Sequence, residues 1–350
     1  MVILTEEKIT ALKALLEASS RVVVLGHTHP DGDALGATAA MCIFLRKIMG
    51  KEVSCLFSDT PPDNLQFLLA EGIPYLFNDK QPGEAVKAIE KADLIVLLDA
   101  NAFNRTEALM LPLQESPAKK VLIDHHLNPD NPGFHLVFST PDISSASELL
   151  YWILKELGFP VRPGMTELSP AHKAIGESLL AGMTTDTNNF ANSVYPSTFR
   201  MASELIAAGV DRDAILQKIY WSYRENRVRL MGYMQSKRLV ILPSGAAYMV
   251  LSRRIQQKYD LREGESEGLV NVPLAIKDVR LSILVKEEGP LWRVSIRSKK
   301  GTSAQKLAQR FFHGGGHENA SGGKILPGED FPRAEGIGPY LERVLNEFLS

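Results

Sequence analysis

The sequence predicts an α/β protein with a doubly wound, mostly parallel sheet in its N-terminal domain and a mixed sheet in a smaller α/β C-terminal domain. Two observations lead to this prediction. Over the first two-thirds of the chain, short β-branched, apolar runs alternate with helical patterns, which is typical of parallel strands covered by helices. In the last third, strand patterns follow one another closely, as in antiparallel or mixed sheets.

Five strands are expected in the N-terminal domain, each a short apolar run. They cover residues 21–26, 52–57, 93–99, 120–126 and 134–139. Helical patterns between them start and stop at residues that favour helix ends. One over 34–50 ends at a glycine, and one over 145–158 opens at a serine and ends at a glycine.

The C-terminal domain is expected to contain three strands and a helix before a glycine cluster. The strands cover residues 246–252, 279–287 and 291–298, and the helix covers 302–312. Between the domains, a charged helical pattern with few breakers indicates a connecting segment. We therefore predict an N-terminal domain over 1–214, a helical linker over 215–228 and a C-terminal domain over 229–350.

Composition excludes several classes of protein. The 350 residues are 45% apolar and 23% charged, the balance of an ordinary globular protein of about two domains. No apolar run reaches the roughly 18 residues of a membrane span, and the first residues do not resemble a secretory signal. We therefore expect a cytoplasmic protein. Its net charge of −2 argues against coating long nucleic acid, so a small partner is expected.

The first candidate site follows the first predicted strand. His27, Asp31 and Asp33 lie in a loop shaped by a proline and a glycine. In an open α/β sheet, ligands bind beyond the carboxyl ends of the strands, and closely spaced carboxylates with an imidazole can hold cations. The alternative is a surface loop in which Asp33 caps the following helix.

Two more strands end in the same way. Asp99 ends the strand over 93–99, and Asp124, His125 and His126 end the strand over 120–126. A further candidate, Asp186, follows an apolar helical stretch. Clustered carboxylates repel one another unless cations offset their charge, so metal explains the pattern better than coincidence.

The mixture of imidazole and carboxylate without cysteine favours Mn²⁺, with Mg²⁺, Co²⁺ or Fe²⁺ as substitutes. Six candidate ligands are more than one ion with open positions needs. Pairs of ions roughly 3.5–4 Å apart recur in phosphoryl hydrolysis, so we expect two Mn²⁺ ions.

A local basic segment marks the C-terminal domain. Six basic and no acidic residues lie between Leu291 and His317. Arg297 could bind a phosphate bidentately, the backbone of Gly314, Gly315 and Gly316 could approach one closely, and His317 adds a donor. The alternative is a solvated strand edge followed by a loop.

These motifs resemble the DHH phosphoesterase superfamily, which is named for the triplet found here at Asp124, His125 and His126. Its first, second and fourth motifs resemble HTHPDGDALGA, LLDANAFNR and GMTTDTNNF, and the GGGH at 314–317 resembles the signature of its associated DHHA1 domain. Length and architecture resemble the stand-alone nanoRNase and 3′-phosphoadenosine-5′-phosphate (pAp) phosphatase group.

The resemblance implies a role for each matching residue. One metal would be held by His27, Asp31 and Asp99. The other would be held by Asp33, Asp99, His125 and Asp186, so that Asp99 bridges the two ions. His126 would face the substrate phosphate, Asp124 would orient the histidines, and Arg105 would contact substrate. Thr106 and Glu107 depart from the family pattern after Arg105.

The resemblance also implies the activity: hydrolysis of short oligoribonucleotides to mononucleotides and of pAp to AMP and phosphate. One alternative is a phosphodiesterase of cyclic or linear dinucleotides. Another is a non-catalytic module that binds nucleotides or RNA, which the intact ligand set argues against. No membrane partner is expected, and a homodimer is left open.

Overall fold

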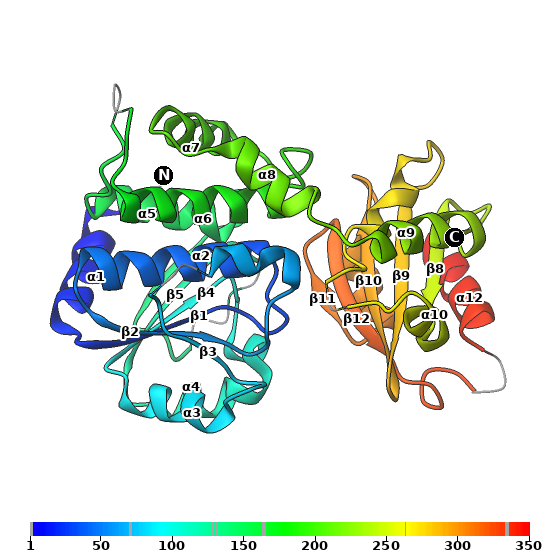
Figure 1. Ribbon diagram of the computed structural model, residues 1–350. Helices are drawn as coiled ribbons and strands as arrows, with labels where there is room; N and C mark the ends of the chain where they lie inside the picture. The colour runs from blue at the N-terminus through cyan, green and yellow to red at the C-terminus, as the bar shows by residue number, and fades with distance from the viewer. Residues whose placement is uncertain are drawn as a thin grey trace. The chain divides into compact units, whose positions relative to one another are not determined.

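The computed structural model describes residues 3–350 except 70, 71, 128, 130, 131, 163–165, 263 and 333–335. The chain divides into two compact units, Met1–Ser222 and Tyr223–Ser350 (Figure 1). The segment predicted as a helical linker contains the end of α8 (Arg212–Tyr220) and the start of α9 (Glu225–Lys237), with residues 221–224 between them. The domain boundaries at 214 and 228 stay a prediction.

The first unit is built on a six-stranded sheet in which every neighbouring pair is parallel. Its order is β3-β2-β1-β4-β5-β6. The strands are β1 (Arg21–Leu25), β2 (Glu52–Phe57), β3 (Tyr75–Phe77), β4 (Leu94–Leu98), β5 (Lys119–Asp124) and β6 (Leu136–Ser139). The predicted parallel sheet is thus confirmed. Strand β3 is absent from the prediction, since three residues are too short for a recognisable period.

Helices cover both faces of this sheet (Figure 1). One face carries α1 (Glu6–Ala18), α2 (Gly32–Ile43), α5 (Ala146–Glu156) and α6 (Pro170–Asp186), and the other carries α3 (Pro82–Lys91) and α4 (Met110–Glu115). Alternation along β1 divides the core: Val22 and Val24 belong to the cluster with α2, α5 and α6, whereas Val23 and Leu25 belong to the cluster with α3.

Shorter segments complete the first unit. A π-helical turn, Phe44–Ile48, extends α2, so the single helix predicted over 34–50 changes its hydrogen-bond pattern near its end. Two 3₁₀ segments, Asp63–Leu68 and Phe103–Leu109, follow β2 and β4, and α7 (Pro196–Ala207) precedes α8.

The second unit contains a mixed six-stranded sheet of order β11-β12-β10-β9-β8-β7. Its strands are β7 (Val240–Ile241), β8 (Ala246–Leu251), β9 (Leu281–Glu288), β10 (Leu291–Ser298), β11 (Gly315–Gly316) and β12 (Ala320–Ile325). Strands β8 and β9 are parallel and the other pairs are antiparallel, which confirms the predicted mixed sheet.

Helices pack against this sheet as well. They are α9, α10 (Arg253–Lys258), α11 (Ala304–Phe311) and α12 (Ile337–Leu349), together with a 3₁₀ segment over Leu269–Ala275. Val294 and Ile296 of β10 pack with α11 and α12, and Leu284 of β9 packs with α9.

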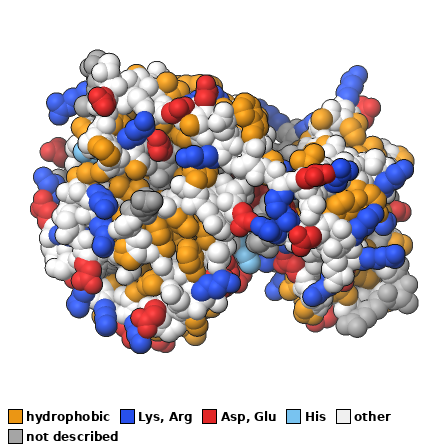
Figure 2. Space-filling view, in the orientation of Figure 1, with side chains coloured by type: hydrophobic (Ala, Val, Ile, Leu, Met, Phe, Trp, Pro, Cys, Tyr) orange, Lys and Arg blue, Asp and Glu red, His pale blue; other side chains and the backbone are white. Residues whose placement is uncertain are grey.

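Basic and acidic side chains are interspersed on the face shown in Figure 2, in line with a net charge of −2. None of the helices in the described part of the chain combines the length and apolar character that crossing a bilayer requires.

Two helices of the first unit approach each other at glycines. A Cβ atom at Gly36 of α2 would lie 2.4 Å from the backbone oxygen of Ser178 on α6, and one at Gly32 would lie 2.3 Å from Oγ1 of Thr185. These contacts bring the N-terminus of α2 against the C-terminal part of α6. Chain segments about 150 residues apart are thereby held together.

We expect Gly36→Ala to destabilise the first unit by about 1–3 kcal/mol, because the added methyl group must displace backbone. The matched control is Gly83→Ala in α3, where a Cβ atom meets nothing within 4 Å. That change should be neutral or stabilising by up to about 1 kcal/mol. Urea unfolding followed by circular dichroism measures both effects, and equal losses in the two variants would contradict the prediction.

Candidate metal centre

The predicted metal ligands meet where the strand order of the first sheet reverses. From β1 the chain continues to β2 and β3 on one side of the sheet, and then to β4, β5 and β6 on the other. The crevice beyond β1 and β4 is where open α/β sheets bind ligands. His27 follows β1 and Asp99 follows β4, so both lie at this position.

A first group consists of His27, Asp31 and Asp99. One ligand atom of each lies within 4.8 Å of the others. His27 Nε2 is 3.5 Å from Asp99 Oδ2 and 3.8 Å from Asp31 Oδ1. His27 Nδ1 is 2.7 Å from the Thr28 carbonyl oxygen. Since a carbonyl only accepts, Nδ1 carries the hydrogen, and Nε2 faces the two carboxylates.

A second group consists of Asp33, His125 and Asp186, again with ligand atoms within 4.8 Å. His125 Nε2 is 3.8 Å from Asp33 Oδ2 and 3.6 Å from Asp186 Oδ2. It is also 3.3 Å from Asp99 Oδ1. The two oxygens of Asp99 therefore face the two groups separately, Oδ2 toward the first and Oδ1 toward the second.

The geometry of both groups fits a metal ion. The separations of 3.3–3.8 Å between nitrogen and oxygen exceed those of ordinary hydrogen bonds. They lie close to the roughly 3.0–3.4 Å that separates two ligands bound about 2.1 Å from one ion. Asp99 Oδ1 is buried and accepts no hydrogen bond from the described residues. A buried carboxylate oxygen without a donor is costly unless a cation faces it.

Electrostatics supports the same conclusion. Burial and repulsion from Asp99 and Asp186 raise the pKa of Asp33 well above its usual value. Burial, together with Asp31 and Asp99, raises the pKa of Asp186 to about 6, although His125 opposes the shift. Asp33 and Asp186 thus resist ionisation in the metal-free centre, which cations would relieve.

Helix ends position several of these side chains. The Ala146 and Ser147 N–H groups at the start of α5 donate to the two oxygens of Asp33 at 2.7 and 2.9 Å. A helix N-terminus favours negative charge, so α5 holds this fully buried carboxylate in place. A Cβ atom at Gly182 would lie 3.0 Å from Asp33 Oδ1, so this position on α6 must be small. No local pattern in the sequence predicts these contacts, since they join segments distant along the chain.

The alternative that Asp33 caps α2 is wrong. The cap is Asp31, whose Oδ1 accepts from the Asp33 and Ala34 N–H groups at 3.0 and 3.1 Å. Asp31 therefore both starts the helix and belongs to the first group, which leaves Asp33 in the first turn with its side chain directed at the second group.

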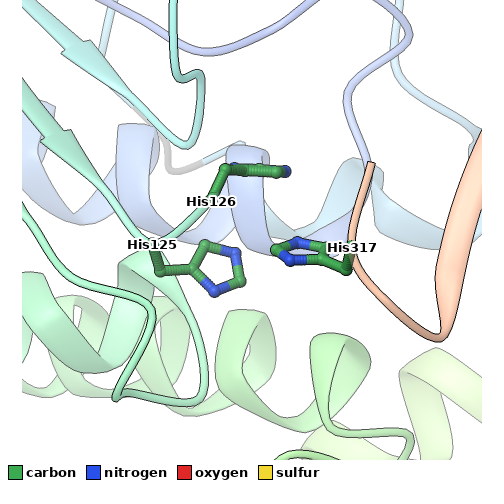
Figure 3. A group of neighbouring side chains, drawn as sticks. All are labelled: His125, His126 and His317. Atoms are coloured by element: carbon green, nitrogen blue, oxygen red, sulfur yellow. The ribbon is translucent and has the colours of Figure 1, made fainter. Parts of the chain in front are cut away.

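Asp124 holds His126. Its Oδ1 is 2.8 Å from His126 Nδ1, and its Oδ2 accepts from the His126 N–H at 3.1 Å. The carboxyl group of Asp124 is completely buried. Figure 3 shows His125 and His126 following β5, and their ring centroids are 4.9 Å apart. The contact is the one expected of an orienting carboxylate, and the catalytic roles of both residues stay predictions.

The predicted substrate-binding residue of the first unit, Arg105, lies half-buried in the 3₁₀ segment Phe103–Leu109. Its carbonyl oxygen accepts from the Thr28 N–H at 2.8 Å, so its backbone contacts the loop that carries the first metal group. Glu107, one of the departures noted from the sequence, has a φ of 44°. The role of the Arg105 guanidinium stays a prediction.

The remaining predicted substrate contacts lie in the second unit. Arg297 of β10 pairs with Ala320, and Gly315 of β11 pairs with Gly322. His317, also labelled in Figure 3, closes the β11–β12 turn through reciprocal backbone hydrogen bonds with Ala320.

The three glycines of this segment differ in what surrounds the position where a Cβ atom would lie. A Cβ atom at Gly314 would lie 1.9 Å from the Gly322 oxygen, and one at Gly316 would lie 2.8 Å from the Ala320 oxygen. These two permit close strand packing. A Cβ atom at Gly315 meets nothing within 4 Å, so Gly315 is the one among them whose open backbone suits a ligand.

Comparison with known proteins agrees with this architecture. The model of the DHH family, N-terminal domain, matches residues 21–183, and that of the DHHA1 domain matches residues 245–335. The crystal structure of an exopolyphosphatase-related protein from Bacteroides fragilis is 33% identical, with a TM-score of 0.87 over 99% of this chain and 97% of that one.

Two relatives with named activities extend the comparison. The bifunctional oligoribonuclease and PAP phosphatase NrnA of Thermus thermophilus is 27% identical over 97% of this chain and 93% of its own length. The cyclic-di-AMP phosphodiesterase GdpP of Geobacillus thermodenitrificans is 26% identical over 88% of this chain, but only 45% of that protein is covered. The chain belongs to the DHH family and carries a DHH domain followed by a DHHA1 domain.

Metal uptake should release protons from the centre. Burial alone would lower the pKa of His27, but Asp31 and Asp99 outweigh it and raise the pKa to about 10. The metal-free ring is therefore charged at neutral pH, and an ion can bind Nε2 only after the proton leaves.

A proton competes with the metal for His27 Nε2 below a pH of about 10. Through His27, the affinity for the metal should therefore rise about tenfold for each unit of pH up to that value. Calorimetric Mn²⁺ titrations at pH 7.5 in HEPES and in Tris should give apparent enthalpies that differ with the buffer's ionisation enthalpy. Equal enthalpies in the two buffers would contradict proton release.

Proposed function

We propose that this chain is a two-metal, Mn²⁺-dependent phosphoesterase that hydrolyses short oligoribonucleotides to mononucleotides and pAp to AMP and phosphate. The observation that carries the proposal is the pair of ligand groups that share Asp99, one with His27 and one with His125. A shared carboxylate between two imidazole-containing groups suits two neighbouring ions. The ligand atoms are nitrogen and oxygen without sulfur, which favours Mn²⁺ over a structural zinc.

Bound at this centre, the ions would supply the positive charge that polarises a phosphate ester and offsets the negative charge of its transition state. His27, Asp31 and Asp99 would hold one ion. The other would be held by Asp33, Asp99, His125 and Asp186.

His126 is the side chain best suited to the substrate. Asp124 accepts from its Nδ1 and from its backbone N–H, which fixes the ring and directs Nε2 away from Asp124. A ring fixed in this way can donate a hydrogen bond or a proton from Nε2 to a phosphate oxygen or to the leaving oxygen.

The second unit carries further residues to which we assign contacts with substrate phosphate. Arg297 offers a planar guanidinium for bidentate contact with a phosphate, and His317 offers a further donor. The space where a Cβ atom of Gly315 would lie is open, so a phosphate could approach the backbone there. Such contacts recognise phosphate and leave the base free, which suits both short RNA and pAp.

The choice of substrates rests on relatives that resemble this chain over nearly its whole length. The Thermus thermophilus protein is covered over 93% of its own length, and a probable NrnA of Streptococcus mutans is 28% identical over 93% of its length. Cyclic dinucleotides remain the competing substrate, since the Geobacillus phosphodiesterase also matches most of this chain. We expect the enzyme to act in the cytoplasm on small substrates. Dimerisation stays a prediction.

The substrate proposal predicts preferential hydrolysis of pAp and of RNA two to five nucleotides long over cyclic di-AMP in the presence of Mn²⁺. Asp99→Asn should lower kcat/KM more than about 100-fold, because contacts to metal ligands alone are typically worth 10–100-fold. The control is Asp213→Asn, whose side chain is 92% exposed. Preference for cyclic di-AMP would contradict the substrate assignment, and equal rates in wild type and Asp99→Asn would contradict the site.

The substrate-binding role of Arg297 predicts a different kinetic pattern. Arg297→Lys should raise KM about 10- to 100-fold, the loss expected when a bidentate charged contact is reduced to a point charge, with little change in Mn²⁺ affinity. Arg293→Lys is the matched control, since Arg293 lies four residues earlier on the same face of β10 and pairs with Glu288. Equal KM values for the two variants would remove Arg297 from the site.

A further inference from the structure

One carboxylate outside the metal groups holds the loop that carries the first group. Asp59 lies just after β2, and its Oδ2 accepts from Thr28 Oγ1 and from the His29 N–H, both at 2.7 Å. The His29 ring Nδ1 is 3.6 Å from the same oxygen. Asp59 thus contacts the segment between His27 and Asp31 without belonging to either group of candidate ligands.

Thr28 links Asp59 to the centre because its polar groups all have partners. Its hydroxyl donates to Asp59, and its N–H donates to the Arg105 carbonyl oxygen at 2.8 Å. Its own carbonyl accepts from His27 Nδ1 at 2.7 Å. The direction of the Thr28 carbonyl therefore determines that Nδ1 keeps its hydrogen when the His27 ring is neutral, and Nε2 is left for an ion.

The backbone of this loop requires an external constraint. His29 has a φ of 50°, a left-handed conformation that costs a non-glycine residue about 1–2 kcal/mol. The charged oxygen of Asp59 accepts the N–H of that same residue, and hydrogen bonds to an ionised acceptor are about twice as strong as neutral ones. The carboxylate can therefore offset the strain in the loop that carries His27 and Asp31.

We propose that Asp59 is a positioning residue of the metal centre, which sets metal affinity by fixing the loop that presents His27 and Asp31. The proposal rests on the proposed two-metal function. It assigns Asp59 no contact with substrate or with the ions. Outer contacts of this kind typically change metal affinity 10- to 100-fold.

The test compares Asp59→Ala and Asp59→Asn with Asp79→Ala. Asp79 is a matched control, because its side chain is also 31% exposed and also accepts from a threonine hydroxyl, that of Thr60. Mn²⁺ affinity is measured by the EPR signal of the free ion, and the melting temperature of the metal-free chain is recorded alongside.

We expect Asp59→Ala to weaken Mn²⁺ binding about 10- to 100-fold and Asp59→Asn to weaken it less, since asparagine keeps an acceptor but loses the charge. The Asp79→Ala chain should bind like wild type. The kcat of Asp59→Ala should recover to within about twofold of wild type at saturating Mn²⁺, because a positioning residue is not needed once the ions are bound.

Thr28→Val tests the same contact from its other side, since it removes only the hydroxyl that donates to Asp59. It should also weaken Mn²⁺ binding. Unchanged Mn²⁺ affinity in folded Asp59→Asn and Thr28→Val chains would overturn the proposal, even if Asp59→Ala fails to fold. A lower metal-free melting temperature with unchanged affinity would likewise overturn it, because it would show a structural role alone.

The test of Asp59 and the test of the proposed hydrolytic activity can fail independently. A wild-type chain that binds Mn²⁺ but hydrolyses neither pAp nor short RNA would refute the function, and the affinities of the variants would still decide the role of Asp59. A wild-type chain that binds no Mn²⁺ would overturn both.

Discussion

The carboxylate of Asp99 lies between two imidazoles, with Oδ2 3.5 Å from His27 and Oδ1 3.3 Å from His125. The described part of the first unit is arranged around this contact. The contact of Asp99 with both imidazoles requires β4 to lie between β1 and β5, which is the strand order observed. It also requires the chain to turn sharply where β4 ends, and Asp99 has a φ of 54° there. Aspartate tolerates this left-handed conformation better than most residues, so the same side chain suits both the backbone and the centre.

These carboxylates can lie close together because helix ends and hydrogen-bond partners surround them. Asp33 accepts from the N-terminus of α5, and Asp31 caps the N-terminus of α2. Asp186 comes from the C-terminal end of α6, which packs on α2 through glycines. The close contact between α2 and α6 therefore does more than fill the core. It brings the carboxylates of three chain segments to one place, where cations can offset their repulsion.

The second unit meets a different requirement, which is to expose backbone without losing a regular sheet. Gly314 and Gly316 let β11 pack closely on β12, and this packing leaves Gly315 with open space where its Cβ would be. Arg297 lies on the adjoining strand β10. Arg297 and Gly315, two of the residues to which we assign phosphate binding, thus lie on strands, which keeps their geometry fixed before a ligand arrives.

The sequence by itself determined the parallel and mixed sheets, the ligand-bearing strand ends and the resemblance to the DHH family. Those signals are local: short apolar runs and the polar residues that follow them directly. Asp59 also follows a predicted strand, so its local signal was present, but nothing nearby in the sequence shows that it contacts Thr28 and His29.

Tertiary structure alone decided the strand order, the choice of Asp31 rather than Asp33 as the cap of α2, and the contact of Asp33 with α5. It also decided which glycines of the 314–316 segment serve packing and which leaves backbone open. Each of these depends on atoms that only folding brings together. The hydrogen bond from the Ala146 N–H to Asp33, for example, joins residues that are 113 positions apart in the sequence. Short-range patterns report which residues can form an element or hold a metal, whereas the partner that each side chain meets is fixed by packing between distant segments.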